Sequence, residues 1–139
     1  MIEAPIRLDA ATRLWRGRRA LQEDALLGGV AEGAQEGLIA LADGCGGHAR
    51  GDLASNIAAD VALRAFARAE GDVPARLRQA AEAANLAVYA RAQGATDCEG
   101  MSTTLLLVHV SGARLHWASV GDSPLWLMRS GRLKRLNAT

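Results

Sequence analysis

The chain has 139 residues, 50% of them hydrophobic and 22% charged, which is enough for one globular domain with one core. Its formal net charge of +1 gives no electrostatic reason to expect binding to nucleic acid or to an anionic membrane. No apolar run approaches the ~20 residues that span a bilayer, and the N-terminus lacks a signal-like apolar segment. Cys45 and Cys98 make neither a C-x-x-C pair nor a disulfide framework, so we expect a reduced, cytoplasmic compartment.

The first third of the chain contains three segments with the pattern of a strand. Residues 6–10 alternate apolar and charged side chains, and residues 25–30 form a short apolar segment. Residues 38–42 are a continuous apolar run, too short for a free-standing helix and typical of a buried strand.

Two helices are predicted next, over residues 51–69 and 75–91, because apolar side chains recur there at helical spacing. Gly71 ends the first helix, and Asp72 with Pro74 begins the second. We expect the two helices to pack against each other in antiparallel fashion and to cover one face of a sheet. The apolar stripes assigned to the core are Leu53, Ile57, Val61 and Phe66 in the first helix and Leu77, Ala81, Ala84 and Val88 in the second.

After Gly100 the period of the apolar residues changes from about 3.6 to 2. Strands are predicted over residues 102–110, 113–120, 125–129 and 132–136, separated by Ser-Gly and Gly-Asp-Ser-Pro turns. Strands combined with a segregated helix pair indicate an α+β fold of layered antiparallel sheets, with residues 1–139 forming a single domain.

Asp43 stands at the end of the predicted buried strand and is followed by Gly44, Gly46 and Gly47. A carboxylate held by a rigid strand, beside glycines that allow close backbone approach, is suited to binding a hard cation through oxygen. The alternative is a strand–turn–helix corner in which Asp43 is a turn or capping residue.

Glu23 and Asp24 form a second acidic group, which follows a cluster of arginines that includes Arg19. Successive residues of a strand point to opposite faces, so only one of the two carboxylates can face a given site. The alternative is a solvated charged loop.

Four motifs, taken together and in this order, resemble the metal-dependent serine/threonine protein phosphatase family, also called PPM or type 2C phosphatases, in its bacterial form. R-A-L-Q-E-D-A from Arg19 is similar to R-x-x-N-x-D-A, and A-D-G-C-G-G-H around Asp43 is similar to D-G-M-G-G-H. G-M-S-T-T from Gly100 and V-G-D-S from Val120 are similar to G-M-G-T-T and V-G-D-S-R.

The resemblance implies a role for each matching residue. Asp43 matches the aspartate that bridges two divalent ions, and Gly44 matches the residue whose carbonyl binds one of them. Glu23 and Asp24 match acidic residues that hold metal-bound waters, and Asp122 matches an aspartate that takes part in a third metal site. Arg19 matches the arginine that binds the substrate phosphate.

The implied function is hydrolysis of phosphoserine or phosphothreonine in a protein substrate, as part of bacterial signalling. The implied cofactors are two or three Mn²⁺ or Mg²⁺ ions, which suit an all-oxygen site and activate water for in-line attack on phosphorus. A planar guanidinium such as that of Arg19 suits two phosphate oxygens. The implied fold is part of a four-layer αββα sandwich.

The chain departs from the family pattern at several positions. Cys45 replaces a Met or His, and we interpret it as a packing residue because a thiolate is not an expected ligand of hard cations. His48 is a weak candidate for a proton donor, with a capping or surface role as the alternative. Ser102 replaces a glycine, and Pro124 replaces the arginine that follows G-D-S.

The largest departure is length, because members of this family continue through about as much sequence again and supply further aspartates there. We therefore expect an N-terminal portion of a catalytic domain, weak or inactive alone, with exposed strand edges that favour self-association. The alternative function is a non-catalytic pseudophosphatase that binds phosphoproteins through Arg19 and the basic cluster.

Overall fold

The computed structural model describes residues 6–45 and 50–137. The order of elements is β1 (Asp24–Val30), β2 (Glu36–Cys45), α1 (Gly51–Arg68), α2 (Val73–Gln93), the short 3-10 helix η1 (Thr96–Cys98), β3 (Ser102–Thr103), β4 (Leu105–Ser111), β5 (Arg114–Val120), β6 (Trp126–Arg129) and β7 (Arg132–Arg135). Both helices and the predicted change to strands after Gly100 are confirmed.

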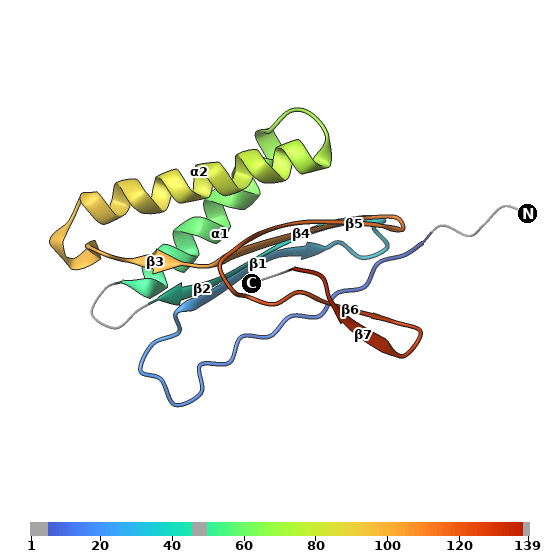
Figure 1. The fold of residues 1–139 in the computed structure, drawn as a ribbon, viewed down its shortest axis with the longest axis horizontal. Helices are drawn as coiled ribbons and strands as arrows, with labels where there is room; N and C mark the ends of the chain where they lie inside the picture. The colour runs from blue at the N-terminus through green and yellow to red at the C-terminus, as the bar shows by residue number, and fades with distance from the viewer. Residues whose placement is uncertain (1–5, 46–49, 138–139) are drawn as a thin grey trace, which may run out of the picture.

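The strands of the main sheet are all antiparallel, in the order β1-β2-β4-β5, and β3 continues the pairing at the end of β2. A separate hairpin joins β6 to β7. In Figure 1, α1 and α2 lie on one side of the main sheet, whereas the β6–β7 hairpin and the N-terminal coil lie on the other side. The fold is therefore α+β, with a helix layer, a central sheet and the hairpin beyond it.

The core between the helices and the sheet is built mainly from alanine. Ala58, Ala59 and Ala62 of α1 are buried against Ala40 and Ala42 of β2. Side chains this small let the helix lie close to the sheet. Leu77 and Leu107 are the largest fully buried apolar side chains of this layer.

The apolar stripe predicted for α1 is only partly right. Phe66 is buried, but Leu53 and Ile57 are half-buried and pack on a smaller cluster around Cys98 and Met101. The alanines of α1 take the central face instead, because bulkier side chains would hold the helix away from the sheet.

The expected strand at residues 6–10 is wrong. Residues 6–23 form neither helix nor strand, and Ile6 is 48% exposed. A strand needs a row of main-chain hydrogen bonds to a neighbouring strand. This stretch instead makes an isolated main-chain bond, from the Leu8 N–H to the Ala34 carbonyl at 3.1 Å. The short alternation of apolar and charged residues was therefore not enough to predict a strand.

The second helix begins as its sequence predicts. The carboxylate of Asp72 accepts a hydrogen bond from the Ala75 N–H at 2.9 Å, and a proline follows in the first turn. This satisfies one of the free N–H groups at the helix start. Within the described residues, no helix is both long and apolar enough to cross a membrane.

Candidate metal and phosphate site

Asp43 and Asp24 are direct neighbours across two strands. The register of β1 and β2 pairs Asp24 with Asp43, so the two carboxyl-bearing residues occupy the same end of the sheet. β2 continues through Cys45, beyond the predicted end at Ala42, because Gly44 and Cys45 pair with β3. The aspartate thus lies within a strand that has neighbours on both sides.

The pKa of the Asp43 carboxyl is raised above its ordinary value of 3.8. Partial burial favours the neutral form, and the adjacent Asp24 both hydrogen-bonds to that form and repels the charged one. The charge of Asp122 acts in the same direction, whereas the positive charge of Arg19 opposes it. Negative charge is therefore concentrated at this point.

Two open hollows meet at the Asp24–Asp43 pair, and both carboxylates line each of them. One hollow, of about 240 Å³, is also lined by Trp15, Arg16, Arg19 and Gln22. The other, of about 280 Å³, is also lined by Leu41, Asp122, Ser123 and Pro124. The arginine and the third aspartate therefore flank the carboxylate pair on different sides.

Glu23 lies immediately before β1 and is placed differently from Asp24, the first residue of that strand. Its carboxylate lies 3.5 Å from the guanidinium of Arg19, and its main-chain carbonyl accepts a hydrogen bond from the Gly44 N–H at 3.0 Å. Glu23 thus contacts Arg19 and the main chain beside Asp43, while Asp24 is the residue that pairs with Asp43.

Gly44 is required where the start of α1 crosses the strand. A Cβ atom at this position would lie 2.2 Å from the Gly51 carbonyl oxygen and 2.5 Å from that of Glu23. Real Cβ atoms essentially never approach other atoms so closely. The absence of a side chain therefore lets three main-chain segments meet directly beside Asp43.

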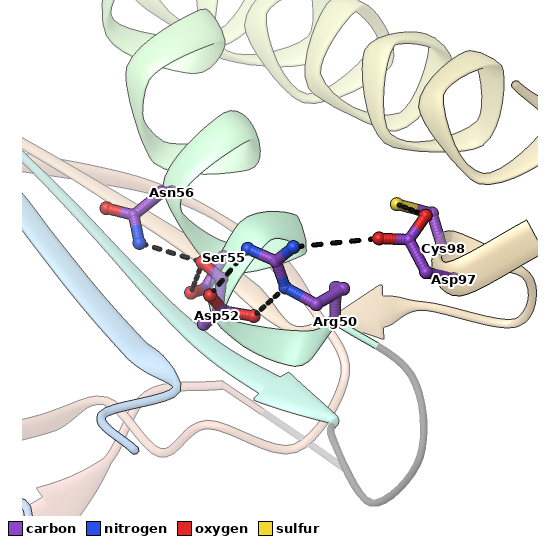
Figure 2. A network of polar contacts seen from close by, with 6 residues as sticks. All are labelled: Arg50, Asp52, Ser55, Asn56, Asp97 and Cys98. Atoms are coloured by element: carbon purple, nitrogen blue, oxygen red, sulfur yellow. Dashed lines mark hydrogen bonds and ion pairs between the residues drawn. The ribbon is translucent and has the colours of Figure 1, made fainter. Parts of the chain in front are cut away.

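An ionic network holds the start of α1 in place (Figure 2). The Arg50 guanidinium donates to both carboxylate oxygens of Asp52, at 2.9 and 3.1 Å, and lies 3.8 Å from Asp97 of η1. This pairing lowers the pKa of Asp52 and raises that of Arg50. The network joins η1 to the first turn of α1, next to the contact between Gly44 and Gly51.

The donor atoms at Asp24 and Asp43 fit a hard divalent cation. Both side chains offer carboxylate oxygen, and a cation between them would relieve the repulsion that raises the Asp43 pKa. Across residues 6–45 and 50–137, however, no group of three or more His, Cys, Asp or Glu side chains is close enough together to hold a metal ion. The described residues that meet here would therefore provide only part of the coordination shell that such a cation requires.

The interpretation of Cys45 as a packing residue is wrong. Cys45 is exposed and lines an open hollow of about 480 Å³ that also contains Asp122. It is the last residue of β2, and β3 pairs with it through Ser102 without covering its side chain. His48, with Gly46 and Gly47, lies outside the described residues, so its predicted role stays a prediction.

Several residues around Asp43 and the loop that carries Asp122 were not identified as site residues from the sequence. Gln22 lines the hollow beside Arg19, and its side chain accepts a hydrogen bond from the Asp24 N–H at 3.1 Å. Thr104 and Ser123 lie within the recognised G-M-S-T-T and V-G-D-S motifs, but nothing local in those motifs indicated their contacts. Asn137, buried near the end of the described chain, carried no sequence signal.

Comparison with known proteins gives the family of the chain. Residues 16–137 match the protein phosphatase 2C family. The chain belongs to that family. The match covers both acidic segments, both helices and the hairpin.

Among curated proteins, this phosphatase-family chain is similar to the serine/threonine protein phosphatase PstP of Mycobacterium tuberculosis, with 38% identity over 142 residues. The alignment covers 98% of this chain and 26% of PstP. Among solved structures it is similar to the PstP catalytic domain in complex with two manganese ions, with a TM-score of 0.71, 38% identity, and coverage of 86% of this chain and 50% of that one.

A further similar structure is the serine/threonine phosphatase Stp1 of Staphylococcus aureus, with a TM-score of 0.75 and 28% identity. That match covers 87% of this chain and 49% of Stp1. The chain therefore spans about half the length of the phosphatase structures that it matches.

Proposed function

We propose that this chain is the N-terminal part of a metal-dependent phosphatase catalytic domain that hydrolyses phosphoserine or phosphothreonine in protein substrates. The observation that carries the proposal is the cross-strand pairing of Asp24 with Asp43, flanked by Arg19 on one side and Asp122 on the other. Membership of the protein phosphatase 2C family and similarity to named serine/threonine phosphatases support it.

In this proposal Asp43 and Asp24 hold divalent cations, with the Gly44 carbonyl and Asp122 as further oxygen donors. Mn²⁺ or Mg²⁺ fits such donors, in two or three sites, and manganese is supported by the PstP structure that contains two manganese ions. When bound, such ions activate water and neutralise phosphate charge.

The chain's own residues bind and orient the substrate. Arg19 is 71% exposed, so its guanidinium is free to reach a phosphate in the hollow beside Asp24. The Glu23 carboxylate, 3.5 Å away, forms an ion pair with this guanidinium. We place the reaction in bacterial cytoplasmic signalling, and the two free cysteines, Cys45 and Cys98, are in keeping with a reducing compartment.

The test combines cation binding with turnover. Calorimetric titration of the chain with Mn²⁺ should give a weak signal that is lost in Asp43→Asn, whereas the exposed coil variant Asp9→Asn should bind like the parent. Phosphoserine-peptide hydrolysis should be Mn²⁺-dependent, and ~10²–10³-fold or more below that of a complete catalytic domain, because part of the shell is missing.

Two results would overturn the proposal. If Asp43→Asn binds Mn²⁺ as well as the parent, Asp43 does not hold the cation. If a phosphopeptide binds through Arg19 but is not hydrolysed even by a longer chain that spans the full length of the matched phosphatase structures, the protein is a phosphoprotein-binding module, which was the alternative.

A further inference from the structure

Thr104 lies directly opposite Asp43, at a point where the strand ladder changes. The β2–β4 pairing ends at Leu41 and Leu106, and the β2–β3 pairing resumes at Gly44 and Thr103 in the same register. Thr104 lies between β3 and β4, is 8% exposed, and belongs to neither strand.

On the side of β2 that faces β3 and β4, Thr104 pairs with both the N–H and the carbonyl of Asp43. The Thr104 N–H donates to the Asp43 carbonyl at 2.9 Å, and the Asp43 N–H donates to the Thr104 hydroxyl at 3.0 Å. A regular ladder would use the Thr104 carbonyl, which instead accepts the hydroxyl of Thr103 at 2.9 Å. A side-chain oxygen thus takes the place of a main-chain one.

The same hydroxyl connects Asp43 to the loop that carries Asp122. Thr104 Oγ1 lies 2.7 Å from Ser123 Oγ, and both side chains are buried. The Thr104 methyl group packs against Gly121, where a Cβ atom would lie 2.8 Å from it and where φ is +91°. Glycine is therefore required at position 121 both for space and for its backbone conformation.

Asn137 fixes that loop from its other end. Its amide nitrogen donates to the Ser123 carbonyl at 2.8 Å and to the Ser119 hydroxyl at 2.9 Å, and its amide oxygen accepts the Leu125 N–H at 2.8 Å. The residue is 6% exposed, so these bonds are made away from solvent. Buried polar groups that are fully paired hold a unique geometry.

We propose that Thr104, Ser123 and Asn137 are positioning residues that set the distance between Asp43 and the Asp122 loop, so that cation binding depends on hydroxyl and amide groups that do not touch the cation. The inference rests on the proposed function, since it assumes that Asp43 holds a cation. It gives a physical role to the second threonine of G-M-S-T-T, Thr104, and to the serine of V-G-D-S, Ser123.

The experiment separates positioning from mere stabilisation. Thr104→Val keeps the shape but removes the hydroxyl, and Thr104→Ser keeps the hydroxyl but removes the methyl group. Phe66→Leu, in the buried helix layer, is a control that disturbs packing away from Asp43. Mn²⁺ affinity is measured by calorimetry at a temperature where circular dichroism shows every variant to be folded.

Thr104→Val should weaken Mn²⁺ binding by about tenfold or more, the usual effect of removing a group that orients a metal ligand. Thr104→Ser should bind nearly as the parent does, and Phe66→Leu should be unchanged. The double variant Thr104→Val/Ser123→Ala should be no weaker than Thr104→Val alone, because both changes break one chain of bonds.

A second readout needs no metal. Hydrogen exchange of the Asp43 amide should accelerate in Thr104→Val and not in Phe66→Leu, because only the first variant removes its acceptor. If Thr104→Val does not fold, Ser123→Ala carries the same comparison, with faster exchange expected for the amides of Asp122, Ser123 and Leu125.

The outcomes are distinguishable. If the parent binds no Mn²⁺, the proposed cation site fails and exchange alone decides the positioning role. Selective acceleration at Asp43 then supports that role, and acceleration that is equal in Phe66→Leu overturns it. If the parent binds Mn²⁺ and Thr104→Val binds it equally well, the positioning role is overturned while the cation site stands.

Discussion

At the scale of single residues, the crowding of negative charge at Asp43 has a consequence for stability. Because the folded chain favours the protonated carboxyl, the pKa of Asp43 lies above its ordinary value of 3.8. The stabilising contribution of the protonated carboxyl to the free energy of unfolding is therefore fully present when the pH is below 3.8. It is lost as the pH rises through the raised pKa. The charged form of this carboxyl works against the metal-free fold.

We therefore expect Asp43→Asn to stabilise the metal-free chain at pH 7, while it removes cation binding. The gain should be on the order of 0.5 kcal/mol, because Asp43 is exposed and its repulsion from Asp24 is screened by solvent. Urea unfolding with a chelator at pH 4 and pH 7 measures it, and the gain should shrink at the lower pH. A variant that is less stable than the parent at pH 7 would contradict this account. Added Mn²⁺ should stabilise the parent and not the variant.

At the scale of elements, the crossing of β2 and α1 depends on the absence of a side chain at Gly44. Gly44→Ala would place a Cβ atom 2.2 Å from the Gly51 carbonyl oxygen, so the helix start or the strand must move. We expect a loss of about 2–3 kcal/mol in the free energy of unfolding, typical of overpacking against main chain. Denaturant unfolding measures this loss.

Gly94→Ala is the matched control for that substitution. Gly94 ends α2 with φ of −87°, and a Cβ atom there would meet only carbonyl oxygens at 3.6 Å, an ordinary contact. This variant should be neutral or slightly stabilising, because alanine restricts the unfolded chain. Equal effects of the two substitutions would show that the approach between Gly44 and Gly51 is not tight in solution.

At the scale of the whole molecule, one helix layer covers one side of the sheet, and within residues 6–45 and 50–137 the β6–β7 hairpin and the N-terminal coil lie on the other (Figure 1). Among the strands of the described residues, β1 and β5 each have one partner in the main sheet, and the hairpin exposes Trp126, Met128 and Leu133. Unpaired strand edges and exposed apolar side chains recruit other chains. We propose that this chain self-associates.

Sedimentation velocity over a range of concentrations should show dimers or larger species. Met128→Lys combined with Leu133→Lys should reduce association, because it places charge on the exposed hairpin, whereas Leu86→Lys on α2 is the matched control on the helix side. A monodisperse monomer at high concentration would contradict the proposal.

Local patterns in the sequence were sufficient for part of this protein. The change of apolar period near Gly100 located the helices and strands, and Asp72 with Pro74 located the start of α2, because helix caps and side-chain periodicity are properties of neighbouring residues. The motifs around Arg19, Asp43 and Asp122 indicated the family and the residues that line the two hollows.

Only the tertiary structure decided how distant residues meet. The choice of Asp24 over Glu23 as the partner of Asp43 follows from the register of β1 and β2, which no single segment contains. The bond between Asp43 and the Thr104 hydroxyl joins residues 61 positions apart, and the buried His109 of β4 is bonded to Glu36 of β2 at 2.7 Å. Such contacts depend on strand order and packing, which the whole chain determines together.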